Sequence, residues 1–147
     1  AGLATFTGAQ RRMQYKGSIN GAEVYDDYAH HPDEVAATIE AVRSMEHERL
    51  VVAFQPHTYT RTKALFDDFV RELGKADHLI LAEIYAARER NDSGISSRDL
   101  QAKIPGSVYC ETLPEVTAYL KEIARKGDVI LTVGAGDIFR AGEALLK

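Results

Sequence analysis

The sequence contains one cysteine, four prolines, no tryptophan and no long apolar run. A single thiol, Cys110, excludes an internal disulfide and fits a reducing compartment. No stretch approaches the roughly 20 apolar residues of a membrane span, and no charged-then-apolar signal segment opens the chain. From these absences we expect a soluble, cytoplasmic domain with no membrane partner.

Positive charge is also scarce. The formal net charge is −4, and the longest basic block is Arg11-Arg12, which argues against a nucleic-acid partner. No Gly-x-x-x-x-Gly-Lys-Ser/Thr motif occurs, so a reaction with ATP needs another domain to hold most of the triphosphate. The chain begins without Met in a small, polar stretch, residues 1–10. We therefore expect an excised fragment, although N-terminal processing also removes Met.

Length and composition are those of one ordinary globular domain. A chain of 147 residues buries about two-thirds of its unfolded surface, so it needs no disulfide or metal for stability. Hydrophobic residues make up 45% and charged residues 27%, which are average values. No repeat, low-complexity tract or linker interrupts the sequence, and we expect residues 1–147 to form a single domain.

The pattern of apolar residues predicts an α/β fold. Asn20-Gly21 favours a tight turn between Tyr15–Ile19 and Glu23–Tyr25, so an antiparallel β-hairpin opens the domain. Strands then alternate with helices at spacings that require parallel crossovers. We expect a Rossmann-like, doubly wound and mainly parallel sheet with helices on both faces. The further strands are Leu50–Phe54, Asp77–Ile84, Ser107–Cys110 and Asp128–Val133; the helices are residues 33–46, an apolar stripe from Leu65 to Leu73 ending at Gly74, and residues 98–103, 114–125 and 137–146.

Two polar loops follow strands of this sheet. Residues 26–33 come after the hairpin, and residues 55–62 come after Leu50–Phe54. In a parallel α/β sheet, strand-to-helix loops emerge at one edge, which is the usual ligand-binding edge. We therefore expect carboxylates, imidazoles and a guanidinium to face one crevice.

The first loop permits more than one interpretation. Asp26 and Asp27 suit Mg²⁺ or ribose hydroxyls, but adjacent aspartates more often stabilise a turn, and alternation lets only one face the crevice. His30-His31 makes a poor zinc site because no Cys-x-x-Cys or His-x-x-x-His partner exists. The helix start at Pro32 favours an anion or a metal-bound phosphate instead, while exposed rings at a helix entry are the simpler alternative.

The second loop places His57 and Arg61 before a helix. A guanidinium in the first turn is unfavourable there, so Arg61 needs a tertiary partner or a ligand carboxylate. Gly134-Ala135-Gly136 lacks the further small residue of a dinucleotide motif, because position 139 is Phe, and we interpret it as a tight turn against the sheet edge. Taken alone, Arg11-Arg12 reads as a solvated basic turn.

Five segments together resemble the C-terminal domain of the Mur ligases. The match extends over essentially the whole chain, with the segments in order and at fitting spacing. The Phe-Gln-Pro-His-x-x-x-Arg-Thr part is similar to the alanine-adding UDP-N-acetylmuramate–L-alanine ligases rather than to the murein-peptide recycling ligases. The segments are residues 8–12, 26–33, 54–62, 83–87 and 134–138.

The resemblance implies one domain of a three-domain enzyme. A UDP-substrate domain and a central ATPase domain complete the family's enzymes, and neither is expected in this chain. Mg²⁺ and ATP phosphorylate the muramate carboxylate of UDP-N-acetylmuramate, and the amine of L-alanine then attacks the acyl phosphate. The domain alone is expected to be inactive, with L-alanine, ATP and the two other domains as its partners.

The resemblance also suggests roles for individual residues. Catalytic roles fall on Arg12, Asp27 and His30, with Arg12 near ATP phosphates and Asp27 near the ribose. Arg61 is the favoured partner of the alanine carboxylate. A further role near Mg²⁺ is suggested for His30, but no residue is firmly assigned to the metal. Position 58 is Thr where some members carry a second Arg, so a two-arginine clamp is not expected. The residues around L-alanine are Tyr28, His30, His57 and Arg61.

Two further hypotheses come from other classes. A phosphoacceptor signalling domain also has paired acids after its first strand, but it needs an Asp after a central strand and a Lys after a late one. Here those positions carry Gln55-Pro56 or Glu83-Ile84, and Gly134-Ala135. A stand-alone ligand-binding module is the other alternative from a different class. Within the family, the recycling ligase that attaches a tripeptide stays open as an alternative.

Overall fold

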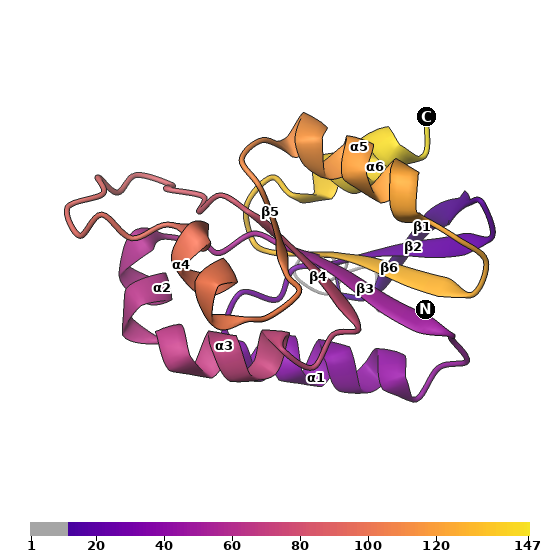
Figure 1. The fold of residues 1–147 in the computed structure, drawn as a ribbon, viewed down its shortest axis with the longest axis horizontal. Helices are drawn as coiled ribbons and strands as arrows, with labels where there is room; N and C mark the ends of the chain where they lie inside the picture. Colours follow the sequence, from indigo (N-terminus) through magenta and orange to yellow (C-terminus); the bar gives the residue numbers. More distant parts are fainter. Residues whose placement is uncertain (1–11) are drawn as a thin grey trace, which may run out of the picture.

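A computed structural model describes residues 12–147. Six strands form one sheet in the order β1-β2-β6-β3-β4-β5 (Figure 1). The strands are β1 (Gln14–Ile19), β2 (Ala22–Asp27), β3 (Arg49–Phe54), β4 (His78–Ala82), β5 (Val108–Cys110) and β6 (Asp128–Val133). The helices are α1 (Pro32–Arg43), α2 (Tyr59–Ala64), α3 (Phe66–Leu73), α4 (Ser97–Lys103), α5 (Leu113–Ile123) and α6 (Phe139–Leu145).

The predicted hairpin is present as β1 and β2. The two strands pair antiparallel, and Ile19 lies opposite Ala22. Asn20 and Gly21 have φ angles of 54° and 83°, the left-handed values that a two-residue turn of the primed type requires. Local sequence therefore determined this part of the fold.

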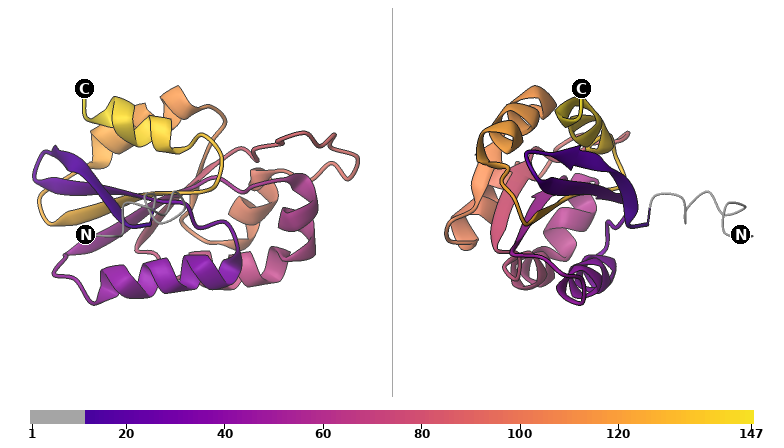
Figure 2. Two further views of the ribbon diagram at one scale, coloured as in Figure 1. Left: turned by 180° about the vertical axis from the view of Figure 1, so that it is seen from behind. Right: turned by 90° about the vertical axis from the view of Figure 1, so that its right-hand side faces the viewer.

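The remaining strand pairs are all parallel, which confirms the predicted fold class. Helices α1, α3 and α4 cover one face of the sheet and α5 and α6 cover the other (Figures 1 and 2). Alternate residues of β3 point to the two cores: Leu50, Val52 and Phe54 to the first, and Val51 and Ala53 to the second. Among residues 12–147, no helix has the length and apolar character needed to cross a bilayer.

The strand order places a topological switch point at the carboxyl edge of the sheet. Strand β6 lies between β2 and β3. The chain leaves β2 and β3 toward the face covered by α1 and α3, but it leaves β6 toward the face covered by α6. Connections that diverge in this way open a space above the strand ends, where open α/β sheets bind ligands.

Some predicted boundaries are wrong. Helix α1 ends at Arg43, three residues before the predicted end, and the C-cap Ser44 donates its backbone N–H to the carbonyls of Glu40 and Val42. The helical region before Gly74 is divided into α2 and α3 by Leu65, whose φ of −113° and ψ of 24° are not helical. No glycine or proline marks this break, so the sequence contained no signal for it.

An ion pair connects strands at the opposite edge of the sheet. The guanidinium of Arg49 donates to both carboxylate oxygens of Asp128, at 2.9 and 2.7 Å, and also to the carbonyl of Ile123 at 2.9 Å. The Asp128 side chain is fully buried and also accepts the backbone N–H of Arg125. These bonds join β3, β6 and the segment that follows α5.

Replacing Asp128 tests the contribution of this ion pair. Asp128→Ala leaves the Arg49 fork without its acceptor, and we expect the free energy of unfolding to fall by about 2–3 kcal/mol. The matched control is Asp92→Ala, since Asp92 pairs with Arg90 at the surface and both side chains are highly exposed. Urea unfolding monitored by circular dichroism measures both variants. Equal effects would contradict the role assigned to the Asp128 pair.

Candidate functional site

The two polar loops lie side by side at the carboxyl edge of the sheet. The ring of His30 is 5.5 Å from that of Tyr28 and 6.0 Å from that of His57, measured between centroids. On the second loop, Nη1 of Arg61 lies 3.4 Å from Nδ1 of His57. Tyr28, His30, His57 and Arg61 thus form a continuous row, as the sequence predicted.

Thr58 positions the Arg61 end of this row. Its φ of 68° is left-handed, a strained conformation that residues outside glycine adopt mainly at functional sites. The Thr58 hydroxyl accepts the backbone N–H of Arg61 at 3.3 Å and so caps α2. No glycine or asparagine marks position 58, so the local sequence contained no signal for this strain.

Arg61 has no carboxylate partner within salt-bridge distance among residues 12–147. The predicted conflict with the helix dipole is small, however, because α2 has only six residues and Arg61 lies near both ends. The reason for expecting a ligand at Arg61 is therefore its lack of an acidic partner in the described region rather than its place in a helix.

The environment of His57 favours the neutral imidazole. Burial lowers the pKa of His57, and the nearby positive charges of Arg61 and His30 lower it further, against a smaller opposing effect of Glu89. The shift follows from desolvation and like-charge repulsion. At neutral pH, His57 therefore offers one nitrogen that can accept a proton.

Asp27 is the most fully hydrogen-bonded side chain of the site. Oδ1 accepts the backbone N–H of Ala29 at 2.9 Å and lies 3.2 Å from Nε of Arg12. Oδ2 accepts the N–H of Met13 at 3.1 Å and the hydroxyl of Thr38 at 3.0 Å. The Asp27 side chain is only 1% exposed. Its hydrogen bonds connect the segment before β1, the first polar loop and α1.

Asp26 points to the other face of the sheet. Its Oδ1 accepts the hydroxyl of Thr132 at 2.6 Å, and the residue is 2% exposed. The two aspartates diverge as strand alternation requires, but neither carboxylate is open to solvent. We expected one of these two carboxylates to face the crevice with oxygens free for a ligand. This is wrong, because hydrogen bonds within the protein occupy the carboxylate of Asp27 as well as that of Asp26.

Arg12 is not a solvated basic turn. Its side chain pairs with Asp27 while remaining 43% exposed, so it presents positive charge beside the first loop. The interpretation of Arg11-Arg12 as a solvated basic turn is therefore wrong for Arg12. Its partner Asp27 belongs to another segment, so the sequence around Arg12 could not predict the pair. Residues 8–11 of the same segment lie outside the described residues.

The start of α1 is already occupied by protein groups. The backbone N–H groups of His30 and His31 both donate to Oε1 of Glu34, and that of Asp33 donates to the His31 ring. Partial burial opposes ionisation of Glu34, but these bonds and the charges of His30 and Arg12 hold its pKa below the ordinary value. A vacant anion site at this helix start, predicted from Pro32, is therefore wrong, because a capping box fills it.

The glycine turn after β6, residues 134–136, and the residues that follow it are hydrogen-bonded to both polar loops. The backbone N–H of Gly134 donates to the carbonyl of Asp27 at 3.1 Å, and that of Ile138 donates to Oε1 of Gln55 at 3.2 Å. The Gln55 amide in turn donates to Asp137 at 2.8 Å. The turn therefore packs against both polar loops, as its interpretation as a tight turn predicted.

Sequence reasoning assigned no role to Tyr85, which follows β4. Its ring stacks on that of His57, with centroids 5.6 Å apart and planes inclined by 19°. Its place in the family-like segment at residues 83–87 was a signal, although that segment indicated no contact. Tyr85 brings a third strand end into the site.

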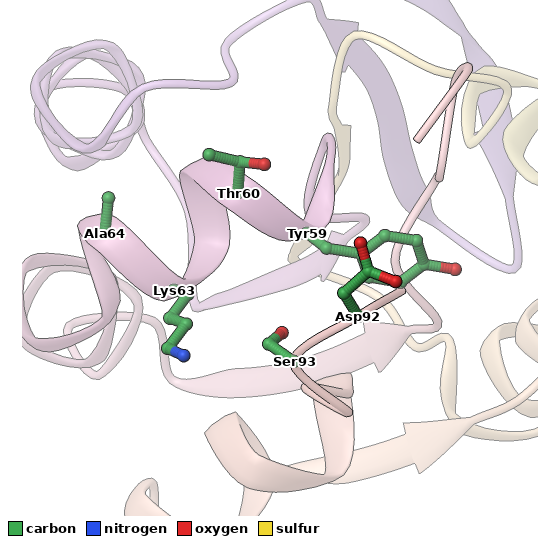
Figure 3. A pocket seen from close by; sticks show the side chains of 6 residues that line it. All are labelled: Tyr59, Thr60, Lys63, Ala64, Asp92 and Ser93. Carbon is green, nitrogen blue, oxygen red and sulfur yellow. The ribbon is translucent and has the colours of Figure 1, made fainter. Parts of the chain in front are cut away.

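A separate cleft of about 540 Å³ lies beside α2 (Figure 3). It contains none of the residues of the row from Tyr28 to Arg61. Within residues 12–147, no group of three His, Cys, Asp or Glu side chains has a metal-binding arrangement. The cleft is lined by Tyr59, Thr60, Lys63, Ala64, Asp92 and Ser93.

Comparison with known proteins connects this site to a family. The sequence matches the family model described as "Mur ligase, glutamate ligase domain" over residues 11–136. Curated relatives named UDP-N-acetylmuramate--L-alanine ligase are 49% identical in Lachnospira eligens, 49% in Agathobacter rectalis and 46% in Clostridium novyi. The alignments cover 99–100% of this chain but 33% of each relative, so the chain spans about a third of their length.

Solved structures agree with this comparison. The UDP-N-acetylmuramate-alanine ligase of Thermotoga maritima is 27% identical, with a TM-score of 0.73 over 92% of this chain and 29% of that chain. A murein peptide ligase from Psychrobacter arcticus shares the fold at 22% identity, with a TM-score of 0.70 over 98% of this chain and 31% of that chain. On the extent of the family match and the identity to these relatives, the chain belongs to the Mur ligase family.

Proposed function

We propose that this chain is the amino-acid-binding domain of a ligase that joins L-alanine to UDP-N-acetylmuramate at the expense of ATP. The observation that carries the proposal is the row of Tyr28, His30, His57 and Arg61, which ends in a guanidinium without a carboxylate partner among residues 12–147. Two relatives that are 49% identical to this chain bear the name of this activity. Since the chain spans about a third of those relatives, we propose that it needs their remaining domains to turn over.

Arg61 supplies the contact for the amino-acid carboxylate. A guanidinium donates two parallel hydrogen bonds to a carboxylate, which fixes the orientation of the bound group as well as its position. The backbone of Arg61 is held by the Thr58 cap, and its side chain contacts His57. A carboxylate on Arg61 would therefore bring the amino group of the same molecule close to the imidazoles.

His57 and His30 provide proton acceptors for the amine. Attack on an acyl phosphate produces a tetrahedral species whose nitrogen must lose a proton before phosphate leaves. The lowered pKa of His57 keeps its ring neutral and ready to accept that proton at neutral pH. Positioning the amine beside an activated carbonyl also raises the rate by proximity.

Arg12 and Asp27 face the nucleotide side in this proposal. Arg12 is exposed enough to reach an ATP phosphate, and Asp27 holds its Nε from within the fold. Direct contact of Asp27 with the ribose stays a prediction. ATP and Mg²⁺ would be bound mainly by the other domains, and His30 would lie toward the region of the metal and the phosphates. A Mur ligase of Thermotoga maritima has been solved in complex with ADP, and it shares this fold at 17% identity with a TM-score of 0.65 over 92% of this chain and 30% of that chain.

The second candidate is a ligase that attaches a murein peptide in place of alanine. The structure from Psychrobacter arcticus supports only the common fold, whereas the relatives near 49% identity favour the alanine-adding reaction. A phosphoacceptor domain finds no support, because Asp26 and Asp27 are buried and engaged in hydrogen bonds.

Substitution of Arg61 tests the carboxylate contact. In the full-length ligase that carries this domain, Arg61→Ala should raise the KM for L-alanine by roughly 10- to 100-fold, as loss of a charge-assisted pair implies. The KM for ATP should change by less than about twofold. Arg61→Lys keeps the charge without the fork and should be intermediate.

Lys63→Ala is the matched control for Arg61, because it removes a cation from the same helix outside the row. ADP release at varied L-alanine and at varied murein peptide measures each variant and separates the two candidate substrates. Normal KM and kcat for alanine in Arg61→Ala would exclude the proposed contact.

The protonation of His57 provides a second test. Its pKa lies below the ordinary 6.5 of histidine, chiefly because of burial and then because of Arg61 and His30, with Glu89 opposing. Arg61→Ala removes a positive neighbour, so the His57 pKa should rise and protonation should begin at higher pH. NMR titration of the His57 ring in the 147-residue chain measures the shift. An unchanged or lower pKa in the variant would contradict the described electrostatics.

Asp27 distinguishes a positioning role from direct nucleotide contact. Asp27→Asn keeps the size of the side chain but places an amide among four donors, so the free energy of unfolding should fall by about 2–3 kcal/mol. The exposed Asp33→Asn is the control, and urea unfolding of the chain measures both. A fully stable Asp27→Asn variant with a raised KM for ATP would instead support direct contact with the nucleotide.

A further inference from the structure

Tyr85 is tied to the second polar loop through its backbone. Its N–H donates to the carbonyl of Pro56 at 2.8 Å, and its carbonyl accepts the N–H of Thr58 at 2.8 Å. These two bonds make an isolated parallel bridge between His57 and Tyr85, beyond the end of strands β3 and β4. The bridge places His57 and Tyr85 side by side beyond the strand ends, where their rings stack.

The ring of Tyr85 is enclosed from two sides. One face lies against the His57 ring, 5.6 Å away between centroids. Toward the glycine turn, a Cβ at position 136 would lie 2.6 Å from Cγ and 2.8 Å from Cδ1 of Tyr85. Gly136 does not have a left-handed φ, so glycine is required there for space rather than for backbone conformation. The ring therefore has little freedom to move away from His57.

We propose that Tyr85 is a positioning residue that holds the His57 imidazole against the bound amino acid. This inference rests on the proposed function for its consequence in catalysis, but its structural part concerns the two rings alone. The Tyr85 ring stacks on one face of the His57 ring. The ring of His30 on the first polar loop and the guanidinium of Arg61, four residues after His57, also lie close to the imidazole. The imidazole is thereby confined to one orientation, and its stacked face is shielded from water.

The exposure of Tyr85 argues against a role limited to packing. The side chain is 36% exposed, and both hydrophobic cores are formed without it. No hydrogen bond of the Tyr85 hydroxyl is present among residues 12–147, so the function is assigned to the ring rather than to the phenol. A phenylalanine should accordingly replace it, and an alanine should not.

Two substitutions test this proposal. In the 147-residue chain, Tyr85→Ala exposes the stacked face of His57, so NMR titration should show a higher His57 pKa, and Tyr85→Phe should match the wild type. In the full-length ligase, Tyr85→Ala should raise the KM for L-alanine by roughly 3- to 10-fold, as expected for one aromatic contact, without changing the KM for ATP. Tyr59→Ala is the control, since Tyr59 lines the cleft beside α2 instead.

Gly136→Ala provides an independent variant if Tyr85→Ala fails to fold. A methyl group at position 136 would lie 2.6 Å from Cγ of Tyr85 and also 2.6 Å from Oε1 of Gln55, so it displaces the Tyr85 ring together with the Gln55 amide. The chemical shifts and titration of His57 should therefore change while every side chain of the row is retained. The proposal is overturned if the His57 titration is the same in wild type, Tyr85→Ala and Gly136→Ala, or if Tyr85→Phe is as defective as Tyr85→Ala. A shifted His57 titration in a ligase that does not use L-alanine would instead refute the proposed function and leave the positioning role intact.

Discussion

The site depends on the buried carboxylate of Asp27. Its two oxygens collect hydrogen bonds from Met13, Ala29 and Thr38 together with the guanidinium of Arg12, and these groups come from three separate segments. A buried carboxylate is stable only when such donors surround it. The requirement to satisfy Asp27 therefore fixes where the first polar loop begins and keeps Arg12 at its border. The positions of Tyr28 and His30, which lie in the first polar loop, follow from these hydrogen bonds of Asp27.

The second polar loop is fixed instead by backbone bonds and by the side-chain amide of Gln55. Gln55 pairs with the end of β6 and with the turn after it, and Thr58 pairs with Tyr85. Four strand ends thus support one row of side chains, Tyr28, His30, His57 and Arg61. Rigid supports combined with an arginine that lacks an acidic partner in residues 12–147 are what a ligand site requires, because preorganised groups lose little freedom on binding.

Several structural features followed from local sequence, and others did not. Asn20-Gly21 predicted the hairpin because its left-handed dihedrals are a local property. The apolar run Leu50–Phe54 predicted a buried strand, and its alternating burial in two cores agrees. The break at Leu65 and the left-handed Thr58 had no local signal. The backbone N–H of Thr58 donates to the carbonyl of Tyr85, a partner that is distant in the sequence. The vacant anion site expected at Pro32 failed because Glu34, one turn further on, reaches back to the loop amides.

The sequence by itself determined the fold class, the two polar loops and their meeting at one edge, because hydrophobic periodicity fixes the order of elements and parallel strands end together. Tertiary structure alone decided which polar groups remain available. Asp26 and Asp27 are consumed internally, Arg12 gains a buried partner, and Tyr85 arrives beside His57 from a distant strand. Hydrogen-bond saturation and ring contact depend on residues far apart in sequence, so no local pattern records them.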